Sequence, residues 1–237
     1  MCKDMKKIDA VILCGGLGTR LKEVLGETPK VMADFNDKPF LEIIISYLKD
    51  QGIKRVVLCT GHEAQLVEDY FSGKDLGIDI EFSREEEPLG TGGAIKNAKR
   101  KIVSDSFFVL NGDSICDVDL ISFLNFHMGK KALVSVVVSE VKENEDFGGI
   151  VLDDKCEIIS FKEKEKTNSP QHVNAGVYCF EKNIFDLMPA ENKFSLEYDL
   201  FPNLINKNIY GFCVDQEFLD IGTPERLVEA QKKQGKL

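Results

Sequence analysis

Short apolar runs alternate with helix-like segments through the first half of the chain. Residues 10–14, 55–60 and 107–110 are rich in β-branched and aromatic side chains, which is typical of buried strands. Residues 40–50 instead carry apolar side chains at helical spacing, and Gly52 follows as a helix-ending residue. Strands alternating with helices in this way predict a parallel sheet covered by helices.

The pattern changes after Lys130, where short strand-like segments are separated by turn residues. The segments expected to be strands are 133–138, 147–152, 157–161, 172–180, 211–214 and 218–221. Such runs favour antiparallel strands added to a parallel sheet. We therefore predict an α/β fold with a Rossmann-like, mostly parallel sheet and an antiparallel extension. We expect a single domain over 1–237, with halves of about 8–130 and about 131–237.

Composition narrows the classes of function. The 237 residues are 43% hydrophobic and 30% charged, as in an ordinary globular chain, and the formal net charge is −10. That charge argues against nucleic acid or an anionic membrane as a partner, but it leaves anionic small substrates open. The longest apolar runs are too short for a membrane span or signal peptide, so we expect a cytoplasmic protein. The seven cysteines lack C-x-x-C spacing, which favours reduced thiols over metal or disulfide roles.

The candidate chemistry begins where the first apolar run meets a glycine turn. Gly15 and Gly16 let a ligand approach the backbone, and N–H groups at the mouth of a following helix attract anions. Arg20 can grip phosphate oxygens in bidentate fashion, and Lys30 adds a mobile positive charge. The segment predicts a triphosphate cradle. A dinucleotide-binding turn fits less well because Leu21 takes the place of its third glycine, and a strand-to-helix turn without ligand is the plain alternative.

Two further segments suggest ligand contacts. In residues 87–94, Pro88 and three glycines would bring the backbone close to a flat ligand, or would form a tight turn without one. Asp113 follows the apolar run 107–110 and would lie at the carboxyl end of a strand, where a carboxylate is well placed to hold a cation. Its alternative role is to cap the next helix. The charged run 162–166 alone indicates a solvated surface.

These motifs together resemble those of the sugar-1-phosphate nucleotidyltransferases. The resemblance rests on the signature of residues 15–21 followed by Pro29 and Lys30, and it covers nearly the whole chain. Cys14 and the segments 36–41 and 87–94 are most similar to the branch that guanylylates D-glycero-α-D-manno-heptose 1-phosphate. The resemblance implies a glycosyltransferase-A-like nucleotidyltransferase fold.

The resemblance also implies a set of site residues. The nucleotide would contact Leu13, Gly15, Gly16, Gly18, Thr19, Arg20, Lys30, Ser83, Leu89, Gly90, Thr91, Gly112 and Asp113. Ser83, Glu85 and Glu87 remain alternatives for reading a guanine base. The sugar phosphate would contact Gly149, Glu163, Lys164, Asn174 and Gly176. Mg²⁺ would be bound by Asp113 and Asp220.

The implied reaction is attack by a sugar 1-phosphate on the α-phosphorus of a nucleoside triphosphate, with release of pyrophosphate. The catalytic residues would be Arg20, Lys30 and Asp113, and Lys164 would align the attacking phosphate. GTP and the heptose phosphate are the substrates that the branch suggests. Another base, or mannose, glucose or N-acetylmuramic acid 1-phosphate, is an alternative, as are a non-catalytic regulatory homologue and a homo-oligomeric assembly. Ser195 is expected to cap a short helix in which Glu197 and Asp199 complement only the helix dipole.

Overall fold

The computed structural model describes residues 4–35, 37–141, 149–161, 171–215 and 218–233. Its large sheet contains nine strands. They are β1 (Asp9–Leu13), β4 (Arg55–Thr60), β5 (Asp79–Arg84), β6 (Ser106–Asn111), β8 (Val134–Val141), β9 (Gly149–Leu152), β10 (Ile158–Phe161), β11 (Gln171–Glu181) and β12 (Ile209–Val214). The two small sheets pair β2 (Asp34–Phe35) with β3 (Lys38–Pro39), and β7 (Ser114–Ile115) with β13 (Leu219–Asp220).

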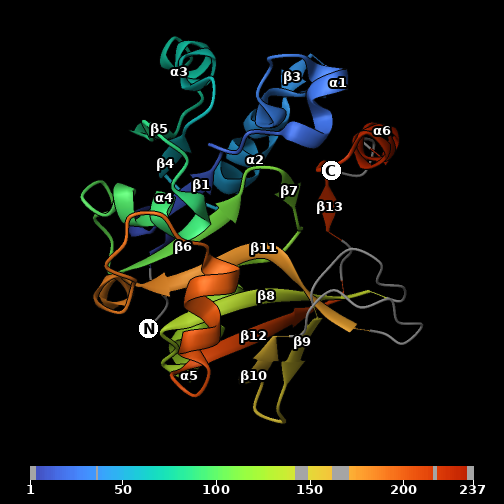
Figure 1. The fold of residues 1–237 in the computed structure, drawn as a ribbon. Helices are drawn as coiled ribbons and strands as arrows, with labels where there is room; N and C mark the ends of the chain where they lie inside the picture. Colours follow the sequence, from blue (N-terminus) through green and yellow to red (C-terminus); the bar gives the residue numbers. More distant parts are fainter. Residues whose placement is uncertain (1–3, 36, 142–148, 162–170, 216–217, 234–237) are drawn as a thin grey trace.

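The first half of the chain builds the parallel part of the sheet. Strands β5, β4, β1 and β6 lie in that order, and each neighbouring pair is parallel. The second half joins through β11, which is antiparallel to β6, β8 and β9 (Figure 1). The predicted α/β fold with an antiparallel extension is confirmed. One detail differs, because β12 pairs with β8 in the parallel direction.

Helices cover both faces of the sheet. The α-helices are α1 (Lys22–Leu25), α2 (Phe40–Asp50), α3 (Ala64–Ser72), α4 (Gly90–Ala98), α5 (Leu120–Lys130) and α6 (Pro224–Lys233). Short 3₁₀ or π-type turns are η1 (Met5–Lys7), η2 (Thr19–Leu21), η3 (Lys30–Met32), η4 (Lys182–Asp186), η5 (Leu196–Leu200) and η6 (Phe201–Leu204). None of the helices within the described residues combines the length and apolarity needed to cross a membrane.

The alternation of side chains along β1 explains the two cores. Ala10 and Ile12 join the core beneath α2, α3 and α5, whereas Val11 joins the core beneath α4, η5 and η6. Successive residues of a strand point to opposite faces, so a continuous apolar run is what a sheet covered on both faces requires.

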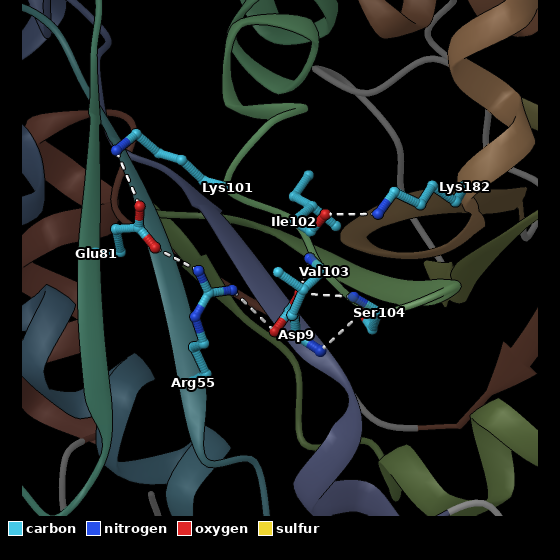
Figure 2. Close-up of polar contacts among 8 residues, drawn as sticks. All are labelled: Asp9, Arg55, Glu81, Lys101, Ile102, Val103, Ser104 and Lys182. Atoms are coloured by element: carbon cyan, nitrogen blue, oxygen red, sulfur yellow. Dashed lines mark hydrogen bonds and ion pairs between the residues drawn. The ribbon is translucent and has the colours of Figure 1, made fainter.

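The amino end of the parallel strands is closed by a polar cluster around Asp9 (Figure 2). Asp9 is 3% exposed, and its carboxylate accepts from the amides of Val103 and Ser104 at 2.6 and 3.0 Å. Arg55 donates to it at 3.1 Å and also pairs with Glu81. These contacts hold β1, β4, β5 and the loop before β6 together. The carboxyl end of the same strands is left for the site.

Candidate active site

A glycine turn follows β1 at the carboxyl edge of the sheet. The Gly112 amide donates to the carbonyl oxygen of Leu13 at 2.9 Å, which joins the loops after β6 and β1. A Cβ on Gly15 would lie 2.9 Å from a carboxylate oxygen of Glu85, whereas a Cβ on Gly16 would meet nothing within 4 Å. A Cβ on Gly15 would also lie 3.2 Å from the backbone nitrogen of Gly61, so position 15 is crowded, whereas Gly16 borders open space.

The glycine turn borders the larger of two adjoining clefts, with a volume of about 350 Å³. Its walls come from the loops after β1, β5 and β6, from η3 and from the start of α4. The predicted site residues among its lining are Leu13, Gly15, Gly16, Lys30, Gly90, Thr91 and Asp113. The other lining residues are Cys14, Leu17, Val31, Glu85, Pro88, Ala94 and Asn111.

Glu85 is the acidic side chain that enters this cleft from the loop after β5. One of its carboxylate oxygens accepts from the amide of Leu89 at 2.9 Å, and burial raises the pKa of the Glu85 carboxyl above its ordinary value. Ser83, in contrast, is 2% exposed, and its hydroxyl accepts from Asn97 on α4 at 3.2 Å. Glu87 is exposed and is not among the lining residues of either cleft. Of the three candidates for reading a base, the structure brings Glu85 to the cleft and turns Ser83 toward α4.

Gly92 and Gly93 make room for protein rather than for a flat ligand, which corrects the sequence interpretation for these two glycines. A Cβ on Gly92 would lie 2.2 Å from the Phe194 ring, and one on Gly93 would lie 2.1 Å from the carbonyl oxygen of Asn192. The amides of Gly92 and Gly93 both donate to the carbonyl oxygen of Phe194, at 3.1 and 3.2 Å. Gly90, with φ of +75°, also packs against Phe194 while lining the cleft.

Thr91 lines the cleft, but its hydroxyl is already engaged by protein. It donates to a carboxylate oxygen of Glu197 at 3.0 Å and accepts from the amide of Leu196 at 2.8 Å. Ser195 caps η5 as predicted and also donates to Glu197, at 2.8 Å. Glu197 therefore does more than complement a helix dipole, because its carboxylate ties η5 to the start of α4.

Lys30 and Asp113 form an ion pair between the two clefts. The ammonium group contacts a carboxylate oxygen of Asp113, and the two side chains are 19% and 28% exposed. Beside them, the Oδ1 atom of Asn111 is buried and lacks a hydrogen-bond partner among the described residues. This edge thus holds a positive group, a negative group and a free acceptor.

The smaller cleft has a volume of about 180 Å³ and shares Asn111 and Asp113 with the larger one. It is lined by Asn111, Asp113, Ser114, Asn174, Gly176, Phe218 and Asp220. The pairing of β13 with β7 sets Asp220 opposite Ser114, and the amide of Ile221 donates to the carbonyl oxygen of Asp113 at 2.9 Å. The two aspartates predicted as metal ligands therefore line one cleft.

Their chemistry fits Mg²⁺. Carboxylate oxygens are the protein ligands that Mg²⁺ prefers, and it is commonly held by one or two of them together with substrate phosphates. Asp220 is 3.5 Å from the guanidinium of Arg226 on α6, and Asp113 is paired with Lys30, so both carboxylates have cationic neighbours. They are the residues that would hold the ion.

A bulge in β11 brings Asn174 and Gly176 to the smaller cleft. Asn174 faces Val138 of β8 while Tyr178 faces Val136, so the register shifts between them. Gly176 adopts φ of +75°, and a Cβ there would lie 2.7 Å from the hydroxyl of Ser114. A glycine is needed at this position for both reasons.

The remaining predicted residues lie at other places. Arg20 and Thr19 are exposed on η2, and neither they nor Gly18, Leu89 and Gly112 are among the described residues lining the clefts. Gly149 pairs with Val173 in the ladder of β9 and β11. Glu163 and Lys164 lie outside the described residues. Of the three cations predicted to bind phosphates, Arg20, Lys30 and Lys164, the structure brings Lys30 to the larger cleft, whereas Arg20 is exposed and does not line it.

Asn111 and Arg226 were not among the site residues predicted from the sequence, although the sequence contains a signal for each. Asn111 precedes Gly112 and Asp113 at the end of an apolar run, where a polar side chain is expected to face the carboxyl edge of the sheet. Arg226 follows Asp220 by six positions near a helix start, and the turn between them brings the two side chains together. Phe218 and Ala94 offered no comparable signal, because apolar residues in strands and helices mostly signify packing.

Comparison with known proteins identifies the family. Residues 9–236 match the family described as "Nucleotidyl transferase". The chain belongs to the nucleotidyltransferase family. It is therefore an enzyme of the class that transfers nucleotidyl groups, here to a sugar 1-phosphate.

The nucleotidyltransferase is 42% identical to a D-glycero-alpha-D-manno-heptose 1-phosphate guanylyltransferase of Aneurinibacillus thermoaerophilus, over 95% of this chain and 98% of that protein. It is 36% identical to a mannose-1-phosphate guanylyltransferase of Mycobacterium tuberculosis, over 94% of this chain and 63% of that protein. Among solved structures, HddC from Yersinia pseudotuberculosis complexed with GMP-PN superposes with a TM-score of 0.85 at 36% identity, over 95% and 99% of the two chains. The predicted family and fold class are confirmed.

Proposed function

We propose that this nucleotidyltransferase transfers GMP from GTP to D-glycero-α-D-manno-heptose 1-phosphate and releases pyrophosphate. The observation that carries the proposal is the pair of adjoining clefts, which meet at Asn111 and Asp113. The larger cleft would hold the nucleotide and the smaller one the sugar phosphate. The reacting phosphates would then meet beside the Lys30–Asp113 pair.

Glu85 supports guanine as the base. The Watson–Crick edge of guanine offers an N1–H and an amino group, and a carboxylate accepts hydrogen bonds from both. One Glu85 oxygen is held by the amide of Leu89, which orients the group while leaving lone pairs for a ligand. The GMP-PN bound to the relative from Yersinia pseudotuberculosis agrees with this choice.

The chemistry requires two anions to be brought together. An oxygen of the sugar phosphate forms a bond to the α-phosphorus, and the bond from the α-phosphorus to the bridging oxygen of the β-phosphate breaks. The attacking phosphate is largely ionised near neutral pH, since its second pKa is near 6, so a strong general base is not required. Positioning and charge neutralisation are what the protein supplies.

The residues divide these tasks. The turn at Gly15 and Gly16 would lie against the phosphates, and Lys30 would stabilise charge that develops on the α-phosphoryl group. Arg20 would bind the departing pyrophosphate, and Lys164 would align the attacking phosphate. Asp113 and Asp220 would hold Mg²⁺, which would supply positive charge to offset that of the phosphates.

The sugar would be held in the smaller cleft. Asn174 would bond a sugar hydroxyl, with Gly176 leaving space beside it, while Gly149 and Glu163 would complete the contacts. The two guanylyltransferases of similar sequence act on heptose and mannose phosphates, so mannose 1-phosphate is the second candidate. The nucleotide substrates and the sequence features favour a cytoplasmic location.

A grid of substrates tests the proposal. Pyrophosphate release is measured for GTP, ATP, CTP, UTP and dTTP, each against heptose, mannose and glucose 1-phosphates, with Mg²⁺ present. We expect GTP with the heptose phosphate to give the highest kcat/KM. A higher kcat/KM with another base would contradict the assignment of Glu85, and a higher kcat/KM with another sugar would contradict the assignment of the heptose.

A further inference from the structure

A chain of hydrogen bonds connects the two clefts through the interior. Thr91, in the larger cleft, donates to Glu197 at 3.0 Å, and Tyr178 donates to the other oxygen of the same carboxylate at 3.4 Å. The Tyr178 hydroxyl in turn accepts from the amide nitrogen of Asn174, in the smaller cleft, at 2.8 Å. Neither Glu197 nor Tyr178 is among the residues lining the two clefts.

The direction of these bonds is set by Glu197. An ionised carboxylate only accepts, so the Tyr178 hydroxyl must use its proton toward Glu197. Its lone pairs are then left for a donor, and the donor is the Asn174 amide nitrogen. Tyr178 is fully buried, and burial followed by the charge of Glu197 raises the pKa of its hydroxyl well above the ordinary value. The hydroxyl therefore keeps the proton that the arrangement needs.

The β11 bulge makes the contact possible. On a regular strand, residues four apart point to the same face. Their Cα atoms are about 13 Å apart, because each residue advances the strand by about 3.3 Å. The shifted register between Asn174 and Tyr178 brings their polar atoms to 2.8 Å instead. Bulges commonly redirect side chains beside active sites.

A second bond fixes the other end of the Asn174 amide. The amide of Gly176 donates to Oδ1 of Asn174 at 2.9 Å. With Nδ2 on Tyr178 and Oδ1 on Gly176, the side chain is held in one of its two possible orientations. One amide hydrogen and one oxygen lone pair are left over, and together they define what the smaller cleft offers to a ligand.

We propose that Glu197 and Tyr178 are positioning residues that fix the donor and acceptor orientation of Asn174 toward the sugar hydroxyls. This inference rests on the proposed placement of the sugar phosphate in the smaller cleft. Because Thr91 donates to the same carboxylate, Glu197 also connects this orientation to the wall of the nucleotide cleft. The preference of the enzyme for its sugar thus depends on the Glu197 carboxylate, which lies outside both clefts.

Tyr178→Phe removes only the hydroxyl and keeps the ring that packs against Phe180 and Phe201. With the substrate pair that the unmodified enzyme turns over fastest, we expect the KM for the sugar 1-phosphate to rise about tenfold, the scale of one lost hydrogen bond. The KM for the triphosphate should change less than twofold. Tyr70→Phe is the matched control, because it removes a tyrosine bond to Glu42 that is remote from both clefts.

Glu197→Gln supplies the sharper test. A glutamine amide can donate to Tyr178, which reverses the hydroxyl and turns it into a donor toward Asn174. We expect this variant to raise the sugar KM as well, but to have no further effect in the Tyr178→Phe background, where no hydroxyl is left to reverse. A sugar KM unchanged by Tyr178→Phe, or fully additive effects of the two substitutions, would overturn the inference.

A measurement without substrate separates this inference from the proposed function. In ¹⁵N-labelled protein, the Asn174 side-chain amide hydrogen that is bonded to Tyr178 should exchange slowly with solvent. Exchange should speed up at least tenfold in Tyr178→Phe and stay slow in Tyr70→Phe. Equal exchange in all three proteins would refute the positioning role whatever the substrate. A slow signal in an enzyme that prefers another sugar would contradict only the heptose assignment.

Discussion

At the scale of single residues, Lys30 lines the larger cleft and pairs with Asp113, which lines both clefts. Lys30→Ala should lower kcat/KM for pyrophosphate release by about 10²-fold or more, the loss expected for one transition-state donor. Lys22→Ala is the control, since Lys22 is an exposed lysine paired with Glu27 at 3.4 Å. Steady-state kinetics of both variants checks the prediction. Equal losses in the two would remove Lys30 from the chemistry.

Base selection should depend on pH through Glu85, the proposed acceptor for guanine. Burial raises its pKa, so it becomes protonated at a higher pH than an ordinary glutamate, and a protonated carboxyl loses acceptor capacity for guanine. The KM for GTP should therefore increase as the pH falls through that raised pKa. Steady-state assays across the acidic range measure this increase.

Glu85→Gln should remove that pH dependence and lower kcat/KM for GTP by about 10- to 10²-fold, the value of a hydrogen bond to a charged group. The same substitution should stabilise the fold near neutral pH. A carboxyl with a raised folded-state pKa stabilises the protein below its unfolded pKa and loses that contribution as the pH rises through the folded pKa. The variant's gain in free energy of unfolding over the unmodified protein, measured by urea unfolding, should then shrink at acidic pH. A variant that keeps full GTP selectivity would contradict the role of Glu85.

At this scale, the sequence predicted the chemistry of each residue type but not the direction of each side chain. The pairing of Asp113 with Asp220 followed from their places at strand ends and from the family resemblance. The exposure of Arg20 and the turn of Ser83 toward Asn97 depend on side-chain directions that no spacing rule fixes. Glu197 looked like a dipole residue because its partners, Thr91 and Tyr178, are distant in sequence.

At the scale of elements, the start of α4 is built around contact with the segment before η5. Gly93→Ala would place a Cβ 2.1 Å from the carbonyl oxygen of Asn192. We expect a loss of about 1–3 kcal/mol in the free energy of unfolding, as for other overpacked sites.

Gly129→Ala on α5 is the opposite case, because nothing lies within 4 Å of the added Cβ. The Gly129→Ala substitution should raise the free energy of unfolding by up to about 1 kcal/mol, because alanine has a higher helix propensity than glycine.

Urea unfolding of the two alanine variants compares them directly. The prediction fails if Gly93→Ala is as stable as the unmodified protein. Sequence reasoning located the glycines of the 90–93 segment but assigned the space beside them to a ligand. The partner is a chain segment about a hundred residues later, and only the tertiary structure could reveal it.

The polar cluster at the amino end of the sheet should contribute strongly to stability. Asp9→Ala would leave two amides and the Arg55 guanidinium without a buried acceptor. We expect a loss of about 3–5 kcal/mol, the range measured when one partner of a buried pair is removed. Asp79→Ala, at an exposed position that begins β5, should change stability by less than about 0.5 kcal/mol. Similar urea concentrations at the midpoint of unfolding for Asp9→Ala and Asp79→Ala would contradict this role of Asp9.

At the scale of the whole molecule, the two halves of the chain meet at β6 and β11. The first half supplies the glycine turn, Glu85 and Asp113 from the ends of parallel strands. The second half supplies Asn174 and Gly176 from the bulged part of β11, and Asp220 from β13. Strand alternation made this architecture predictable, whereas the bulge was not, because its two extra residues leave no mark in the apolar pattern.

The most direct measurement is a crystal structure of the enzyme with a non-hydrolysable GTP analogue, heptose 1-phosphate and Mn²⁺ in place of Mg²⁺. Anomalous scattering locates the metal independently of the surrounding atoms. We predict an anomalous peak bound by Asp113 and Asp220, with the guanine beside Glu85, the triphosphate over Gly16 and the sugar against Asn174. A nucleotide bound outside the larger cleft, or a metal away from both aspartates, would contradict the proposed site.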